Sequence, residues 1–137
     1  MHKFTLGIEE EFQILDSDSL KLHSQMSKII DGGKVFLKER IKEEMHQSMV
    51  EMGTNICENI TQARDEVSYL RQQILELASK EDLKVAAAGT HPFSHWSEQL
   101  ITPNPRYDQL IAEMKDVARS NLIFGMHVHV AIPNREE

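Results

Sequence analysis

The sequence predicts an α+β fold, in which an open, mainly antiparallel sheet carries helices on one face. Two observations lead to this prediction. Residues 4–14 and 122–132 alternate between apolar and other side chains, with the period of two that is typical of half-buried strands. Residues 60–80 instead repeat apolar side chains at steps of three and four, which gives an amphipathic helix one apolar stripe. Such helices are buried by packing on the apolar face of a sheet.

The composition fits one globular domain covering residues 1–137. With 137 residues and a net charge of −7, the chain is long enough for a core, and it has no basic cluster that would indicate nucleic-acid binding. A nucleotide remains compatible, because Mg²⁺ can neutralise its phosphates. No apolar run approaches the length of a membrane span, and Met1-His2-Lys3 leads into a strand rather than a signal peptide. We therefore expect a cytoplasmic protein with no nucleic-acid or membrane partner.

The first strand contains three consecutive glutamates, of which Glu9 and Glu11 share one face. Their Cα atoms should lie roughly 6–7 Å apart. Carboxylates on one patch of a sheet repel each other unless a cation lies between them. Taken alone, this pattern fits either a solvated acidic face or a cation site.

The middle of the chain is expected to mix helix and strand. A short helix at residues 22–30 should be ended by Asp31-Gly32-Gly33, a turn signal. Residues 35–44 are ambiguous, since their apolar positions fit a strand and their Lys/Glu content fits a helix. A second strand with a polar face should cover residues 47–57 and place Glu51 on that face.

The helix at residues 60–80 should be structural, with Asn59 as its N-cap. A short strand at residues 83–89 follows. The next helix should begin at Pro105, with Asn104 as N-cap, and run to about Ser120. Its inward side chains would be Tyr107, Leu110, Ile111, Met114 and Val117.

The last strand places His127 and His129 on one face, opposite a run of apolar residues. If this strand lies near the first one, the two imidazoles and two carboxylates form a plausible cation site. No GxGxxG or GxxxxGK[ST] motif is present, which argues against a doubly wound nucleotide fold. A nucleotide would have to bind through metals on the surface of the sheet.

Five segments in the same order make the sequence similar to the type 2 glutamate–cysteine ligases, also called carboxylate–amine ligases. The opening Gly7-Ile8-Glu9-Glu10-Glu11-Phe12 resembles the signature of that family. The remaining four are Gln47-Ser48-Met49-Val50-Glu51 with Thr54, Gly89-Thr90-His91-Pro92-Phe93 with Trp96, Arg106-Tyr107, and Gly125-Met126-His127-Val128-His129-Val130.

The resemblance implies a glutamine-synthetase-like catalytic domain that binds ATP, metals and substrates on a curved antiparallel sheet. Such enzymes phosphorylate a carboxylate, typically the γ-carboxylate of glutamate, and an amine such as that of cysteine then displaces phosphate. This activity would belong to glutathione biosynthesis. Divalent cations are needed to neutralise the phosphates during transfer.

The family pattern also suggests roles for individual residues. Glu9, Glu11, Glu51 and His127 would bind Mg²⁺ or Mn²⁺. Glu44, His129, Arg106 and His91 would contact the substrates. Three of these contacts have alternatives. His129 also fits a hydrogen bond to a ligand carboxylate, Arg106 fits a surface group at a helix start, and His91, with Trp96, fits a loop-shaping role.

Members of this family are considerably longer than 137 residues, so the chain corresponds to an N-terminal part of the catalytic domain. A partial sheet leaves an open strand edge, which predicts a homo-oligomer or a complementing C-terminal chain. Two functional hypotheses follow. One is part of an ATP-dependent carboxylate–amine ligase, and the other is a non-catalytic metal- or ligand-binding remnant of that family.

Overall fold

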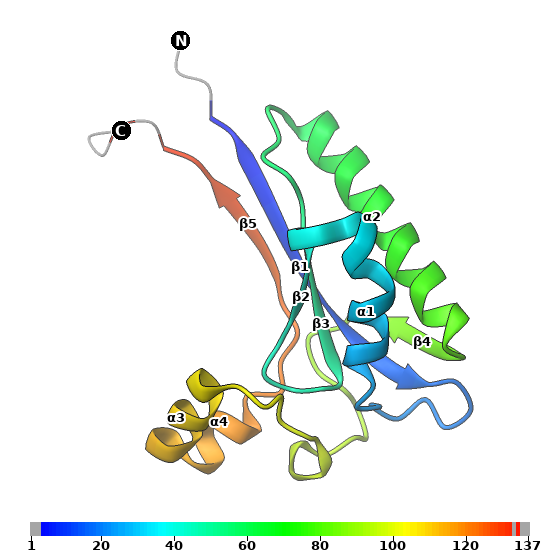
Figure 1. Cartoon of the computed structure of the whole chain (residues 1–137). Helices are drawn as coiled ribbons and strands as arrows, with labels where there is room; N and C mark the ends of the chain where they lie inside the picture. Colours follow the sequence, from blue (N-terminus) through cyan, green and yellow to red (C-terminus); the bar gives the residue numbers. More distant parts are fainter. Residues whose placement is uncertain (1–3, 133, 135–137) are drawn as a thin grey trace.

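A five-stranded antiparallel sheet organises the computed structural model, which describes residues 4–132 and 134. The long strand β1 (Leu6–Asp16) lies at its centre. On one side it pairs with β3 (Met49–Gly53), and β3 pairs with the short strand β2 (Ile41–Glu43). On the other side, β5 (Met126–Val130) pairs with the first half of β1 and β4 (Leu83–Ala86) with the second half. Figure 1 shows this arrangement and confirms the expected open antiparallel sheet.

Two helices, α1 (Met26–Leu37) and α2 (Ile60–Lys80), lie on the same face of the sheet (Figure 1). They bury the even-numbered side chains of β1, such as Phe12 and Ile14, in the main hydrophobic core. The helix predicted at residues 60–80 is confirmed residue for residue, and the Asn59 side chain accepts a hydrogen bond from the Gln62 backbone N–H at 3.0 Å. The opposite face of the sheet, with the odd-numbered residues of β1, carries neither helix.

The predicted end of the first helix at Asp31-Gly32-Gly33 is wrong, because α1 begins later and continues through these residues to Leu37. Neither glycine has a positive φ, so they serve close packing rather than a turn. A Cβ on Gly33 would lie 3.0 Å from side-chain carbons of Ile41 and Leu77, and one on Gly32 would lie 3.1 Å from Leu77. The glycines therefore let α1 approach α2 and β2.

The ambiguous stretch at residues 35–44 contains both kinds of structure. It holds the last turn of α1, the 3₁₀ turn η1 (Lys38–Arg40) and β2. The strands predicted at 47–57, 83–89 and 122–132 are present but shorter, as β3, β4 and β5. The apolar side of β5 is exposed at Met126, Val128 and Val130, because α1 and α2 cover the other strands and β5 lies beyond them (Figure 1).

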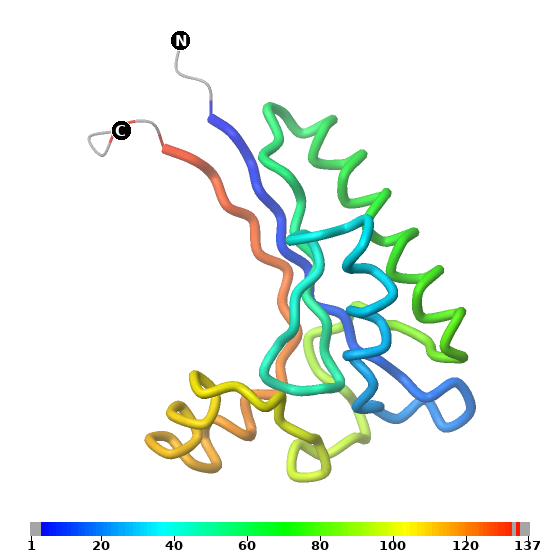
Figure 2. Tube along the Cα trace, viewed as in Figure 1, coloured from blue at the N-terminus to red at the C-terminus, as the bar shows by residue number. Residues whose placement is uncertain are grey.

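The helix predicted from residue 105 to about 120 is divided into α3 (Pro105–Met114) and α4 (Asp116–Ser120). The break is at Lys115, whose φ of 49° is left-handed and whose backbone N–H bonds to the Ile111 carbonyl. The expectation that its apolar side chains enter the core is wrong, since α3 has no buried residue and Val117 is exposed. These helices follow the turn η2 (Trp96–Glu98) along the chain. They lie at one end of the sheet, as Figure 2 shows.

Within residues 4–132 and 134, no helix combines the length and the apolar character that crossing a membrane requires.

Candidate metal and substrate site

Strand register brings the polar residues of four strands onto the face of the sheet that lacks α1 and α2. Glu11 of β1 lies opposite Glu51 of β3, and Glu51 lies opposite Lys42 of β2. Glu9 of β1 lies opposite His127 of β5. The first and last strands are therefore neighbours, which meets the condition for a shared cation site, and the carboxylates and imidazoles meet on one surface.

Three carboxylates form a tight group at the centre of this surface. One ligand oxygen from each of Glu11, Glu44 and Glu51 lies within 4.8 Å of the others. Glu44 is half-buried, and this burial raises its pKa, as do the nearby charges of Glu51 and Glu11. The sequence assigned Glu44 to substrate, and the structure brings it beside two of the predicted metal ligands.

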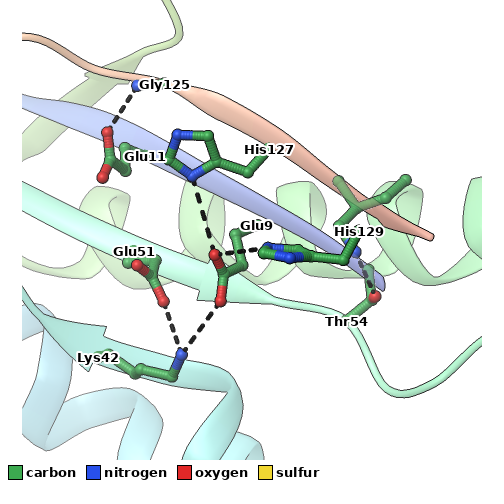
Figure 3. Close-up of polar contacts among 9 residues, drawn as sticks. Glu9, Glu11, Lys42, Glu51, Thr54, Gly125, His127 and His129 are labelled. Carbon is green, nitrogen blue, oxygen red and sulfur yellow. Dashed lines mark hydrogen bonds and ion pairs between the residues drawn. The ribbon is translucent and has the colours of Figure 1, made fainter. Parts of the chain in front are cut away.

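Glu9 is not a member of that group and contacts the two histidines of β5 instead. The His129 Nε2 atom lies 3.0 Å from Glu9 Oε2, and His127 Nδ1 lies 3.8 Å from the same oxygen. The hydrogen bond with His129, and the positive charge of Lys42, lower the pKa of Glu9. The predicted ligands therefore occupy two adjacent places, a three-carboxylate group and a Glu9–histidine group. Figure 3 shows Glu11 and Glu51 of the first place and all three side chains of the second.

Lys42 joins these two places. Its Nζ atom lies 2.7 Å from Glu51 Oε1 and 3.6 Å from Glu9 Oε1, and Figure 3 shows the ammonium between the two carboxylates. The hydrogen bond with Glu51 raises the pKa of Lys42, so the side chain stays charged. The sequence pattern does not single out this residue, because Lys42 falls in the stretch at residues 35–44, whose apolar positions fit a strand and whose Lys/Glu content fits a helix.

Gly125, which directly precedes β5, orients Glu11. Its backbone N–H donates to Glu11 Oε2 at 2.6 Å. A Cβ at this position would lie 3.0 Å from His127 Nε2 and 3.4 Å from Glu11 Oε2, so a side chain there would push against both groups. The glycine thus allows His127 and Glu11 to approach the same stretch of backbone.

A cavity of about 640 Å³ opens beside the carboxylates. Its lining includes the polar residues Glu11, Glu44 and His127, and α3 and α4 supply apolar residues such as Leu110, Met114 and Val117. Of the side chains that the sequence placed in the core, all except Ile111 therefore line a cavity.

Arg106 and Tyr107, at the start of α3, line the same cavity as Glu44. The charge of Arg106 counteracts part of the rise in the pKa of Glu44. Burial raises the pKa of the Tyr107 hydroxyl, and the charge of Glu44 adds to this effect. The predicted substrate residue Arg106 is thus close enough to the carboxylates to share their cavity.

His91 and Trp96 lie in the loop between β4 and α3 and do not line this cavity. The His91 Nδ1 atom accepts hydrogen bonds from the backbone N–H groups of Phe93 and Ser94, and its Nε2 bonds to the Leu20 carbonyl. Trp96 packs against a small core cluster that includes Leu15 and Met49. These contacts fit the loop-shaping role.

The middle glutamate of the triplet faces the other way. Glu10 is buried against α2, where Arg71 binds it through two hydrogen bonds of 2.9 and 2.7 Å. The triplet therefore combines one structural carboxylate with two that reach the open face.

The donor set suits a divalent cation that prefers oxygen. Carboxylates are the usual ligands of Mg²⁺ and Mn²⁺, and an imidazole is compatible with Mn²⁺. Glu11, Glu44 and Glu51 would hold such an ion, and the Glu9–histidine group offers a second place beside it. A bound cation would also relieve the repulsion among the three carboxylates.

Comparison with known proteins gives a consistent picture. The sequence profile of glutamate–cysteine ligase family 2 matches residues 5–137. Curated proteins from Chloroflexus aurantiacus and Solibacter usitatus, both named "Putative glutamate--cysteine ligase 2", are 51% and 50% identical over 133 residues. These matches cover 97% and 96% of this chain but 34% of each relative, so the chain spans about a third of their length.

A solved structure shares the fold. The glutamate–cysteine ligase of Francisella tularensis, crystallised in complex with AMP, superposes with a TM-score of 0.74 at 14% sequence identity. The alignment covers 96% of this chain and 27% of that one.

Proposed function

Because the chain belongs to glutamate–cysteine ligase family 2, we propose that it carries part of the active site of an ATP-dependent carboxylate–amine ligase. The substrates would be ATP, glutamate and an amine such as that of cysteine. The observation that carries the proposal is the group formed by Glu11, Glu44 and Glu51 beside an open cavity. The AMP bound to the Francisella enzyme supports a nucleotide as one ligand.

The reaction would proceed in two steps, the transfer of a phosphoryl group to the carboxylate and the displacement of phosphate by the amine. An oxygen of the glutamate γ-carboxylate attacks the γ-phosphorus of ATP, and ADP leaves. The amine nitrogen then attacks the acyl carbon, phosphate leaves and the nitrogen loses a proton. A divalent cation held by Glu11, Glu44 and Glu51, with Glu9 and His127 beside it, would neutralise the phosphates.

The remaining side chains would bind and orient the substrates. Arg106 lines the cavity with Glu44 and would bind a substrate carboxylate or phosphate through its guanidinium. His129 fixes Glu9 through the 3.0 Å hydrogen bond and would keep it aimed at the cation. His91 would act through the loop that it shapes.

We further propose that the open edge of β5 pairs with another polypeptide segment, from a second copy of this chain or from a complementing C-terminal chain, and that this segment completes the site. Two observations support such a partner. β5 pairs with β1 alone among the described strands, and its apolar residues Met126, Val128 and Val130 are exposed. An unpaired strand edge beside an apolar surface is a typical place for strand addition.

The test is to mix the 137-residue chain with a separately produced polypeptide carrying the rest of the Chloroflexus sequence. We expect a stable complex that releases ADP from ATP only when glutamate and an amine are both present. A Glu11→Gln chain should form the same complex and release about 10- to 100-fold less ADP, the range of losses typical of changes at a metal site. A complex of the parent chain that releases no ADP would identify the chain as a non-catalytic remnant.

A further inference from the structure

Lys42 occupies a position in the acidic face that a metal ion could fill. We propose that its ammonium is an internal counter-cation, which holds Glu9 and Glu51 together in the metal-free protein and opposes the binding of a divalent cation. The inference rests on the proposed function, because it deepens the description of the same site. It assigns to Lys42 the role of setting the metal affinity, as a positioning residue rather than a metal ligand.

The geometry of the sheet fixes Lys42 in this place. It lies directly across from Glu51 in the β2–β3 pair, and Glu51 lies directly across from Glu11. The ammonium thus ends a row that begins with the two carboxylates of Glu11 and Glu51, and it also reaches Glu9, 3.6 Å away. Figure 3 shows that it approaches both carboxylates from the side of β2.

The neighbouring basic residue does not share this role. Arg40 binds Glu66 of α2 at 3.3 Å, and its guanidinium lies 5.2 Å from the centre of the Tyr69 ring. Its positive charge is therefore already paired with a helix residue. Lys42, two positions after Arg40 and within β2, is the side chain that this segment directs to the acidic face.

The contact with Glu51 has an electrostatic consequence. The Glu51 side chain is only 11% exposed, so water neutralises its charge poorly, and Lys42 compensates for part of that deficit. The same oxygen atom is then less available to a metal ion. A divalent cation at the three-carboxylate group would share Glu51 with the Lys42 ammonium, which lies 2.7 Å from Glu51 Oε1, and two cations this close repel each other appreciably even with water-like screening.

The experiment compares the parent chain with Lys42→Met, Lys42→Arg and a control, Lys28→Met. Lys28 also pairs with a carboxylate, at 4.0 Å from Glu81, but on the helical side of the fold, so its loss removes the same charge away from the site. Two quantities are measured for each protein. They are the Mn²⁺ dissociation constant by electron paramagnetic resonance and the melting temperature in EDTA.

We expect Lys42→Met to bind Mn²⁺ about tenfold more tightly than the parent, which corresponds to about 1.4 kcal/mol. Lys42→Arg keeps the charge and should stay within about threefold of the parent, as should Lys28→Met. Without metal, Lys42→Met should melt about 3 °C lower than the parent, the shift expected for about 1 kcal/mol in a domain of this size, because its carboxylates lose their counter-charge. Lys28→Met should melt within about 1 °C, as an exposed pair contributes little.

Equal or weaker Mn²⁺ binding by Lys42→Met would overturn the inference. If neither the parent nor any variant binds Mn²⁺, the proposed metal site fails, and the melting temperatures then decide the role of Lys42. Equal melting temperatures of Lys42→Met and Lys28→Met would in that case show that Lys42 is no counter-cation.

Discussion

Replacing Arg71 by Met should destabilise the fold while leaving the acidic face intact. Glu10 would keep its buried carboxylate, whose side chain is 8% exposed, and lose both of its hydrogen bonds, at 2.9 and 2.7 Å. Removing one partner of a buried ion pair typically costs about 3–5 kcal/mol. The Arg71 side chain is 50% exposed, so water can reach the site after truncation, and we expect a loss of about 2–3 kcal/mol.

The assay is urea denaturation followed by circular dichroism, with the free energy of unfolding extrapolated to water. Arg64→Met is the matched control, because Arg64 lies exposed on the same helix and should change stability by less than about 0.5 kcal/mol. The double variant Glu10→Met with Arg71→Met should recover stability relative to Arg71→Met, since no unpaired charge is then buried. A loss for Arg71→Met no greater than that of Arg64→Met would refute the reasoning.

Two further predictions concern the site and its pH dependence. Gly125→Ala places a Cβ 3.0 Å from His127 Nε2 and should weaken Mn²⁺ binding several-fold by calorimetry, as expected for a change next to metal ligands; an unchanged affinity would contradict this. Burial lowers the pKa of His46 below its usual 6.5, against a hydrogen bond with the Arg119 carbonyl. In this pH range the unfolded chain binds a proton at His46 more readily than the folded chain does. The free energy of unfolding should therefore be highest above about pH 6.5 and should fall as the pH drops through the lowered pKa, by up to about 1.4 kcal/mol per pH unit. The urea concentration at the unfolding midpoint, measured between pH 7 and 5, should depend less on pH for His46→Gln than for the parent. An equal dependence on pH in the two proteins would exclude His46 as the cause.

Features that depend on local periodicity were predictable from the sequence. The alternation in residues 4–14 placed Glu9 and Glu11 on one face, and the apolar stripe together with the cap at Asn59 defined α2. The Gly32-Gly33 pair misled the prediction, because its turn propensity competes with the close packing of α1 on Leu77 and Ile41. Local propensity carries no information about such a tertiary contact.

Features that depend on pairing between distant strands were less accessible. Lys42 meets Glu51 only through the register of β2 on β3, and β2 has three residues, too few for a clear alternation. Arg71 and Glu10 are 61 residues apart, and nothing near either one indicates the other. The presence of Glu44 beside Glu11 likewise depends on how the segment between β2 and β3 folds back to the sheet.

The central claim is that the acidic face binds a divalent cation, and a calorimetric titration with Mn²⁺ tests it most directly. The comparison is between the parent chain, the double variant Glu9→Gln with Glu11→Gln, and a control with the same charge change at Glu76 and Glu113. The control residues lie on α2 and α3, where each accepts a hydrogen bond from a glutamine of its own helix. We predict saturable binding by the parent and the control, and none by the Glu9/Glu11 variant, whose circular dichroism spectrum should match that of the parent. Binding by the Glu9/Glu11 variant with the affinity of the parent would contradict the account.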